Sequence, residues 1–505
     1  MTVDTDRLSI ARRRQTTLAL MIATAMQAFD ATIANVALPQ LERGFGGGIG
    51  LGSWVMTSYL CASAVTAILT GWLRRHLGAR RVFTGAVGLF VAASLLCALA
   101  TTFDSLIVFR LIQGAAAGII LPLAQAIILD IYPKPEHGRM LAIWGAAIMA
   151  GPMLGPVLGG VITDMASWRW IFGINAPLGA IALFGLAGVP SGRRLRSGDP
   201  VDCWGIILLV IATGSLQLVL QRSIGRIWPP SPETLGELTV EIGAGGLIAL
   251  RCWRSRFSLF RFDVFRDLNF ALAALYNFLV GAMLFATIVF IPALAEGPFA
   301  WNATESGLVI APRGIGTMAM MVAIRQIINR VDQRALLAIG LLITAGALAL
   351  MARVPPHDGQ LWLAMTSAAQ GVGVGLLFTP LSTIAYSTLG AELRTDAAGV
   401  YNLVRQLGCA TGVAAMTAVL QARIQIRLAD LSAEGMIVAS SAGPSSIVSF
   451  GAYTDCFQLL AIATLAMAPG VALFRTVRAN RRETAVPTPQ SSVVPDPQSN
   501  VGDSD

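Results

Sequence analysis

Asp30 is the residue whose type and position most strongly suggest chemistry. It lies in TTLALMIATAMQAFDATIANVALP (16–39), an apolar run long enough to cross a lipid bilayer. An ionisable group at such depth is costly and by default marks an ion or proton pathway. Because a helix rises 1.5 Å per residue, Asp30 lies about 12 Å from the end of this span near Leu38.

Arg110 is the expected partner of Asp30. It lies about 10 Å into the apolar run 104–130, so the two opposite charges have similar depths. Each charge alone would be expensive in the membrane, and together they should pair. An apolar medium favours the neutral acid and a nearby arginine favours the carboxylate, so Asp30 could gain and lose a proton. The alternative is an ion pair with a purely structural role.

The run around Arg110 also predicts the wall of a cavity. Polar and small side chains fall on one helical face, which suits a water-filled cavity or a helix-packing surface. This face comprises Arg110, Gln113, Gly114, Ala117, Gly118, Leu121 and Gln125. Further candidates for a substrate cavity are Arg313, Arg405, Tyr276 and Phe378. The two arginines lie near the middle of their spans, where they either contact substrate or hold the second half in register.

The segment GAAIMAGPMLGPVLGG combines close contact with a bend. Gly151, Gly155 and Gly159 recur every four residues and form a flat stripe for helix contact. Pro152 and Pro156 remove backbone donors and bend the helix. A gating seam between two halves would use both properties, and so would packing alone. Gly160 directly follows the last glycine of the stripe.

The elements that must position these residues are membrane-spanning helices. Of 505 residues, 55% are hydrophobic and only 13% charged, whereas a soluble domain carries about 25% charged residues. A spanning helix needs about 20 apolar residues, and the sequence therefore predicts an all-α polytopic membrane protein with 14 transmembrane helices. The predicted spans are 16–38, 51–73, 80–101, 104–130, 140–163, 169–189, 203–221, 235–254, 269–295, 304–325, 334–353, 360–388, 396–420 and 451–474.

The loops indicate two six-helix halves with two helices between them. The basic loops GWLRRHLGARRVF and RQIINRVDQRALL occupy matching places, which favours a duplicated transporter with its substrate site at the interface. A long outward loop is expected at about 421–450, with room for a short amphipathic helix. The predicted regions are a cytoplasmic N-terminus (1–15), an N-terminal half (16–189), basic linkers with two extra helices (190–267), a C-terminal half (268–476) and a disordered cytoplasmic tail (477–505).

Charge placement and missing motifs exclude several classes of protein. The net charge is +8, but the arginines concentrate in the termini and alternate loops. This indicates cytoplasmic termini rather than a nucleic-acid partner. The phosphate-binding motif GxxxxGK[ST] is absent, and six cysteines and three histidines show no metal-ligand spacing. We therefore expect no enzyme activity, nucleotide, metal or other cofactor, and a transporter driven by the proton gradient.

Eight segments together resemble one family. They are FDATIANVALP, GWLRRHLGARR, FRLIQG, GPMLGPVLGG, WRWIFGINAPLG, LFRFDVFRDLNF, APRGIG and NLVRQLG. In this order they resemble the fourteen-span drug:proton antiporters of the major facilitator superfamily, in the EmrB branch of the EmrB/QacA subfamily. The resemblance covers about residues 10–475 and implies a multi-pass protein of the bacterial inner membrane.

The resemblance also implies roles for individual residues. Asp30 would be the proton-coupling acid and Arg110 its partner. Gly151, Pro152, Gly155, Pro156, Gly159 and Gly160 would form the antiporter motif. Gly71, Gly78, Arg80 and Arg81 would form the cytoplasmic loop motif. This sequence departs from that motif at Arg75, where the family has an acid, and at His76, and Arg325 replaces a glycine in the second copy.

The favoured function is proton-driven efflux of small amphipathic compounds. Asp30 is the one acid placed deep in a span, against Arg110, Arg313 and Arg405, so neutral, weakly acidic or anionic compounds fit better than dications. The resemblance implies a possible periplasmic adaptor and outer-membrane channel as partners, besides membrane lipid. The alternatives are an uptake carrier for a nutrient or siderophore on the same fold, and a non-transporting membrane sensor.

Overall fold

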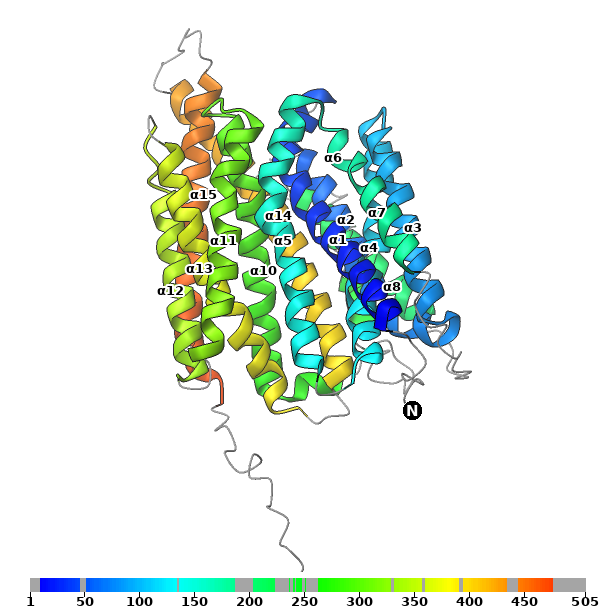
Figure 1. The fold of residues 1–505 in the computed structure, drawn as a ribbon. Helices are drawn as coiled ribbons and strands as arrows, with labels where there is room; N and C mark the ends of the chain where they lie inside the picture. The colour runs from blue at the N-terminus through cyan, green and yellow to red at the C-terminus, as the bar shows by residue number, and fades with distance from the viewer. Residues whose placement is uncertain are drawn as a thin grey trace, which may run out of the picture.

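The computed structural model describes most of the predicted spans as helices (Figure 1). The described residues are 10–45, 51–133, 136–186, 203–222, 236, 239–240, 242–247, 250, 262–327, 331–356, 359–389, 394–433 and 444–475. Within them lie 10 helices long and apolar enough to cross a membrane, with shorter apolar helices at Leu154–Met165, Trp170–Gly185 and Trp204–Ser215. Span 235–254 is described only in part and is helical there. The all-α fold is thus confirmed, while linker 190–202 and tail 477–505 lie outside the described residues.

The N-terminal half consists of six spanning segments. They are α1 (Ile10–Gly44), α2 (Leu51–Leu77), α3 (Ala79–Ala98), α4 (Phe103–Ile131), α5 (His137–Met165) and the consecutive short helices α6 (Trp170–Gly173) and α7 (Asn175–Gly185). Local signals set several boundaries. Gly78 turns the chain between α2 and α3 with a φ of 86°, a conformation that suits glycine. Thr102 and Ser105 form a capping box that begins α4.

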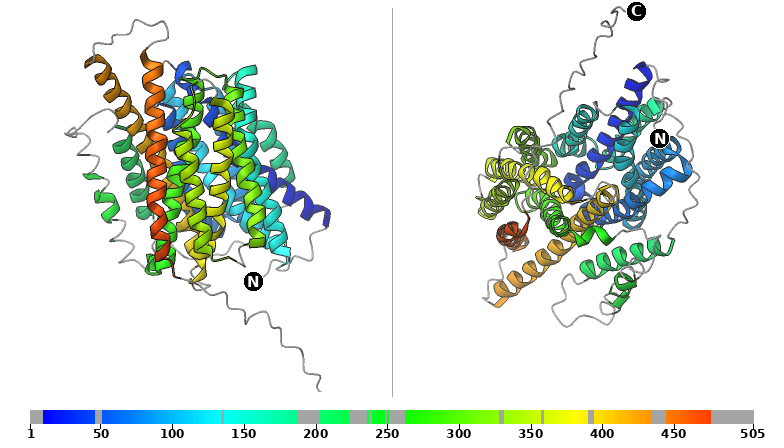
Figure 2. Two further views of the ribbon diagram at one scale, coloured as in Figure 1. Left: turned by 90° about the vertical axis from the view of Figure 1, so that its left-hand side faces the viewer. Right: turned by 90° about the horizontal axis from the view of Figure 1, so that it is seen from below.

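The C-terminal half repeats this plan. It consists of α10 (Leu268–Glu296), α11 (Ala303–Ile327), α12 (Gln333–Met351), α13 (Gly359–Ser387), α14 (Arg394–Ala433) and α15 (Pro444–Met467), with the 3₁₀ helices η4 (Phe262–Arg266) and η5 (Ala468–Leu473). The additional helix α8 (Cys203–Arg222) packs against α2 and α14. The view along the helix axes shows the two halves as neighbouring groups of helices (Figure 2).

The first part of the loop expected at about 421–450 is helical, but as a continuation of the preceding span rather than as a separate short helix. α14 continues as a helix to Ala433. The segment QARIQIRLADLSA is polar but rich in Ala, Leu, Arg and Gln, which favour helix. The loss of hydropathy after residue 420 therefore reflects polar residues within a continuing helix.

The two halves share one packing scheme. In the first, α1 packs against α5, α2 against α4 and α3 against α4; in the second, α10 packs against α14, α11 against α13 and α12 against α13. Between the halves, α5 packs against α11 and, correspondingly, α14 against α2. α1 and α10 also contact each other at the centre.

Glycines on α4 and α13 show which residues of the two halves correspond to each other. Each of these glycines approaches the backbone of the neighbouring helix too closely for a side chain. The contacts are Gly114 with Tyr59, Gly118 with Ser63, Gly371 with Arg313 and Gly375 with Thr317. Tyr59 on α2 and Arg313 on α11 therefore hold corresponding positions.

The contacts between the halves differ at the two ends of the bundle. We call the end where α1 begins proximal and the end where α1 finishes distal; these are the lower and upper ends in Figure 1. At the distal end, Asp164 after the α5 glycines accepts hydrogen bonds from the first residues of α11. Arg43 of α1 pairs there with Glu296 of α10 at 3.0 Å. At the proximal end, the pair Arg74–Asp130 joins helices of one half. The described conformation is therefore joined across its halves at the distal end.

Candidate functional site

Asp30 and Arg110 form an ion pair inside the N-terminal half. Arg110 Nη1 lies 2.9 Å from Asp30 Oδ2, and neither side chain has exposed surface. The pairing expected from their depths is therefore present. A buried pair of this kind is tolerated only where further hydrogen bonds satisfy both groups.

Two amides complete the coordination of the Asp30 carboxylate. Gln113 Nε2 donates to Oδ1 at 2.9 Å, and Asn175 Nδ2 donates to the same oxygen at 2.7 Å. Asn175 also donates to Ser94 Oγ at 2.9 Å, and Ser94 donates to the carbonyl of Phe172. These hydrogen bonds form a chain from Asp30 on α1 through Asn175 on α7 and Ser94 on α3 to the carbonyl of Phe172 on α6.

Besides Asp30, groups of α2 and of its own helix α4 hold Arg110. Its Nε donates to the carbonyl of Val55 at 3.3 Å, and its Nη1 also donates to Gln113 Oε1 at 2.9 Å. The ring of Tyr59 covers the guanidinium, with Cζ 4.3 Å from the ring centroid. The remaining amino group, Nη2, is buried without a hydrogen-bond partner. Nη2 can therefore donate a hydrogen bond to a new partner when the ion pair rearranges.

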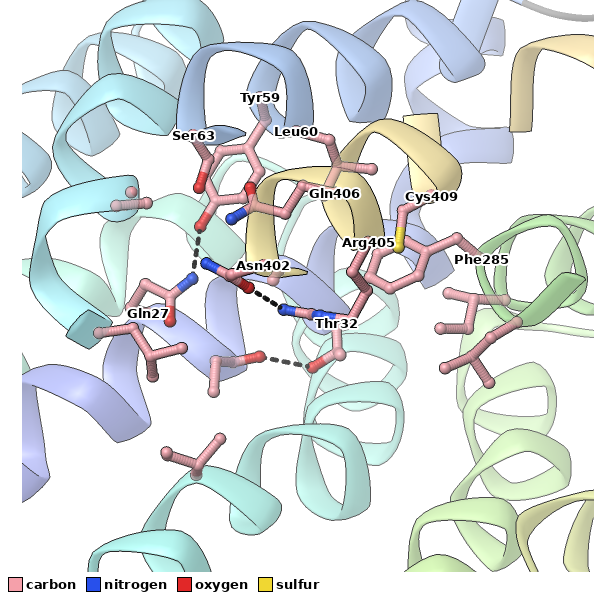
Figure 3. A pocket seen from close by; sticks show the side chains of 18 of the residues that line it. Gln27, Thr32, Tyr59, Leu60, Ser63, Phe285, Asn402, Arg405, Gln406 and Cys409 are labelled. Atoms are coloured by element: carbon pink, nitrogen blue, oxygen red, sulfur yellow. Dashed lines mark hydrogen bonds between the residues drawn. The ribbon is translucent and has the colours of Figure 1, made fainter. Parts of the chain in front are cut away.

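A cavity of about 210 Å³ lies between the two halves (Figure 3). Its wall takes residues from α1, α2, α4, α5, α10, α11, α13 and α14 and is mostly apolar. On the side of the first half, Gln27 donates a hydrogen bond of 3.3 Å to the Tyr59 hydroxyl. On the side of the second half, Arg405 donates a hydrogen bond to Asn402. Figure 3 shows both pairs facing the same space. Tyr59 thus contacts both the cavity and Arg110.

The cavity is cationic on the side of the C-terminal half. Arg313 and Arg405 both line it, and none of its described lining residues is Asp or Glu. Arg313 is 6% exposed, and its Nη1 donates to Thr287 Oγ1 at 3.4 Å. Arg405 Nη2 donates to Asn402 Oδ1 at 2.9 Å on the same helix. Both guanidinium groups are therefore held by neutral oxygens.

The other cavity residues predicted from the sequence fall in several places. Phe378 lines the cavity. Gln113 lies behind the wall, on Asp30. Gln125 is exposed on α4. Tyr276 points away, donating its hydroxyl to the carbonyl of Met467 at 2.6 Å and packing on Phe474.

The glycine and proline motif of α5 serves two contacts. Gly151, Gly155 and Gly159 lie against α1, where Thr32 Oγ1 also donates to the carbonyl of Gly151 at 3.0 Å. Gly160 lies against the backbone of Ala303 at the start of α11. The stripe thus packs within one half, and its last glycine lies at the seam between the halves.

The two prolines of this motif are described unequally. The carbonyl of Pro156 approaches Gly307 of α11, so that this turn of α5 also meets the other half. The side chain of Pro152 lies outside the described part of the structure.

The proximal loop motif lies at the turn between α2 and α3. Gly78 makes the turn, Gly71 and Arg81 are exposed, and Arg80 is half-buried. The ion pair of this region joins Arg74 at the end of α2 to Asp130 at the end of α4.

Sequence reasoning missed two polar groups of the site. Asn175 sits in the predicted span WRWIFGINAPLG, where an amide among apolar residues could have singled it out. Gln27 lies one turn before Asp30 on α1 and reaches Tyr59 instead of the carboxylate. Periodicity alone gives no reason to choose these two amides over others, because their partners come from distant helices.

Comparison with solved structures supports the fold. The chain superposes on the nucleoside transporter NupG (D323A mutant) with a TM-score of 0.63 at 14% identity, covering 92% of this chain and 100% of that one. It superposes on the inward-open xylose transporter XylE from E. coli with a TM-score of 0.60 at 13% identity, covering 93% and 98%. At these identities the likeness concerns the fold alone.

Sequence comparison gives closer relatives. The chain is 34% identical over 405 residues to the multidrug export protein EmrB of Haemophilus influenzae, covering 79% of each chain. It is 32% identical to EmrB of Escherichia coli over 82% of each chain. It is also 31% identical to the fatty acid resistance protein FarB of Neisseria gonorrhoeae, over 81% of this chain and 80% of that one. The family pattern of the Major Facilitator Superfamily matches residues 20–413. With two matching six-helix halves around a central cavity, this chain belongs to the Major Facilitator Superfamily of membrane transporters.

Proposed function

We propose that this protein is a proton-driven exporter of small amphipathic compounds in a bacterial inner membrane. The observation that carries the proposal is the buried Asp30–Arg110 pair beside the cavity between the halves. A charged pair inside an apolar bundle is costly, and proton relays are among the uses of such groups in membranes. The names of the relatives in Haemophilus influenzae and Escherichia coli favour export over uptake.

The orientation of the chain in the membrane gives the transport cycle its direction. The arginine-rich loops favour a cytoplasmic proximal end, so the described conformation is joined across its halves on the outer side. In that conformation Arg110 and two amides donate hydrogen bonds to the carboxyl oxygens of Asp30. Substrate would enter from the cytoplasm, and the distal contacts would then break to release it outside. Asp30 would take up a proton there and carry it inward on the return step.

The test is substrate-driven proton movement in inverted membrane vesicles, reported by a pH-sensitive dye. A panel of amphipathic acids, neutral compounds and cations is added to wild type and to Asp30→Asn. Wild type should release protons with at least one compound, and Asp30→Asn should release none. The matched control is Asp104→Asn, an exposed acid at the start of α4 in the same half, which should behave as wild type.

A second assay separates proton coupling from the movement of substrate across the membrane. Exchange of labelled for unlabelled substrate across the membrane needs the alternation of the two halves but no net proton movement. Asp30→Asn should retain this exchange while losing uphill transport. Equal proton release by wild type and Asp30→Asn would remove Asp30 from the coupling role. Accumulation of substrate inside right-side-out vesicles would favour the uptake alternative.

The periplasmic adaptor and outer-membrane channel implied by the family resemblance remain a prediction. They would dock where the exported compound leaves, at the distal end of the bundle. Copurification of the full-length protein with an adaptor encoded beside its gene would support them.

A further inference from the structure

The two halves carry their charges in different ways at corresponding positions. Gly151 of α5 lies against Ala28 of α1, as Gly408 of α14 lies against Phe278 of α10. This register aligns Asp30 with Val280. The register of α4 and α13 described above likewise aligns Arg110 with Ser367, an uncharged side chain. The ion pair of the first half therefore has no counterpart at the same positions of the second.

The second half instead directs positive charge at the cavity. Arg313 takes the place that Tyr59 has in the first half, and Arg405 of α14 lines the same cavity. Arg313 is almost fully buried, yet the hydrogen bond that its side chain donates to the Thr287 hydroxyl is long, at 3.4 Å. Within the described residues neither arginine forms an ion pair. A desolvated guanidinium without a counter-ion is costly, and an anion in the cavity would offset that cost.

We propose that Arg313 and Arg405 form an anion-binding subsite and that the exported compounds are amphipathic monoanions, such as carboxylates or sulfonates with an apolar body. This rests on the proposed export function and names its substrate class. A guanidinium presents paired N–H donors that match the oxygens of such groups. The positive charge comes from two helices, α11 and α14, of one half.

The rest of the wall suits the apolar body of such a compound. Leu284, Phe285, Ile288 and Phe378 line the cavity with the arginines. Figure 3 shows the ring of Phe285 next to Arg405, facing the same space. A cationic compound would meet two like charges and no carboxylate among the described lining residues, whereas a neutral one would leave both guanidiniums without a counter-ion.

The substrate also lies close to the proton site without touching it. Tyr59 lines the cavity on one side and covers Arg110 on the other. An anion held by the C-terminal half would therefore act on the Asp30–Arg110 pair through this ring and through its own negative charge.

Direct binding tests the subsite. Full-length protein in lipid nanodiscs is titrated calorimetrically at fixed pH with three probes of one apolar body: 2-naphthalenesulfonate, 2-naphthalenemethanol and (2-naphthylmethyl)trimethylammonium. Empty nanodiscs give the lipid background. Wild type should bind the sulfonate about tenfold or more tightly than the alcohol, as expected for a hydrogen bond to a charged group, and the cation most weakly.

Variants of the two arginines test the assignment. Arg313→Gln and Arg405→Gln should each weaken sulfonate binding about tenfold or more and leave the alcohol unchanged. Arg405→Lys, which keeps the charge, should recover part of the loss. The control is Arg353→Gln, an exposed arginine after α12 in the same half, which should bind all three probes as wild type does. Thermal unfolding of each variant in detergent reports whether it is folded.

Two results would overturn the subsite: equal affinity of wild type for the sulfonate and the alcohol, or an equal loss of both probes in folded arginine variants. The same titration on Asp30→Asn separates this proposal from the proposed function. Charge-selective binding together with proton release that does not depend on Asp30 would refute the coupling role alone. Asp30-dependent antiport of the cationic probe would refute the anion subsite alone.

Discussion

At the scale of single residues, the Asp30 carboxylate is more fully coordinated than an ion pair requires. One arginine and two amides donate to it, and the amides come from α4 and α7. This arrangement holds the carboxylate in one place while leaving Arg110 Nη2 without a partner. A small movement of α4 or of the Tyr59 ring could therefore exchange the partners of Arg110 without exposing it to lipid.

Tyr59 should limit proton leak between the cavity and the ion pair. Tyr59→Ala removes the ring that covers Arg110 and should let water reach the pair, so that an imposed pH gradient across proteoliposomes collapses several-fold faster without substrate. Tyr59→Phe keeps the ring and the cation–π contact, worth about 0.5–2 kcal/mol, and loses only the bond to Gln27. It should leak at the wild-type rate. Equal leak in all three proteins would show that the ring is no barrier.

At the scale of helices, α5 owes its role to where each of its glycines lies. Three of them let α1 approach, and Gly160 lets α11 approach at the distal end. Since α1 carries Asp30 and α11 carries Arg313, α5 packs against both the helix of the buried ion pair and a helix of the cavity wall in the other half. The bundle thus contains a contiguous route of packed backbones between the two sites.

Gly160→Ala should weaken the distal seam. The added methyl group would meet the backbone of Ala303 and Thr304, which cannot yield as a flexible side chain does, at a cost of about 1–3 kcal/mol. Transport should fall and the distal end should open more often. The control on the same helix is Gly145→Ala, where nothing lies within 4 Å of the added methyl. Equal transport by the two variants would place the seam elsewhere.

At the scale of the whole molecule, the distal contacts between the halves hold one of the two states that alternating access requires. Asp164 accepts from the backbone of Ala303 at 3.2 Å, and from the backbone and hydroxyl of Thr304 at 2.7 and 2.6 Å. A carboxylate at the first turn of α11 also complements the helix dipole. These bonds and the Arg43–Glu296 pair must break before the distal end can open.

Asp164→Ala should shift the molecule toward a state that is open at the distal end. Three lost bonds at about 1 kcal/mol each change the ratio of the two states by roughly a hundredfold. Spin labels at Leu99 and Leu361, both exposed at the distal ends of opposite halves (73% and 70%), report the separation in a background without native cysteines. The distance between the labels should lengthen in the variant. An unchanged distance distribution would mean that these bonds do not hold the closed end.

The sequence by itself determined properties that lie along a helix. Hydrophobic run length gave the spans, and the rise of 1.5 Å per residue placed Asp30 and Arg110 at matching depths before their contact was known. The spacing of Gly151, Gly155 and Gly159 likewise predicted close helix contact. These inferences hold because lipid imposes the same length and polarity requirements on every spanning helix.

Only the tertiary structure decided what lies around each helix axis. It brought Asn175 to Asp30, set Gln113 behind the cavity wall, turned Tyr276 toward Met467 and divided the α5 glycines between α1 and α11. It also extended α14 to Ala433, beyond the predicted span. The rotation of a helix and the identity of its neighbours depend on packing between segments far apart in the chain, whereas depth depends only on the segment itself.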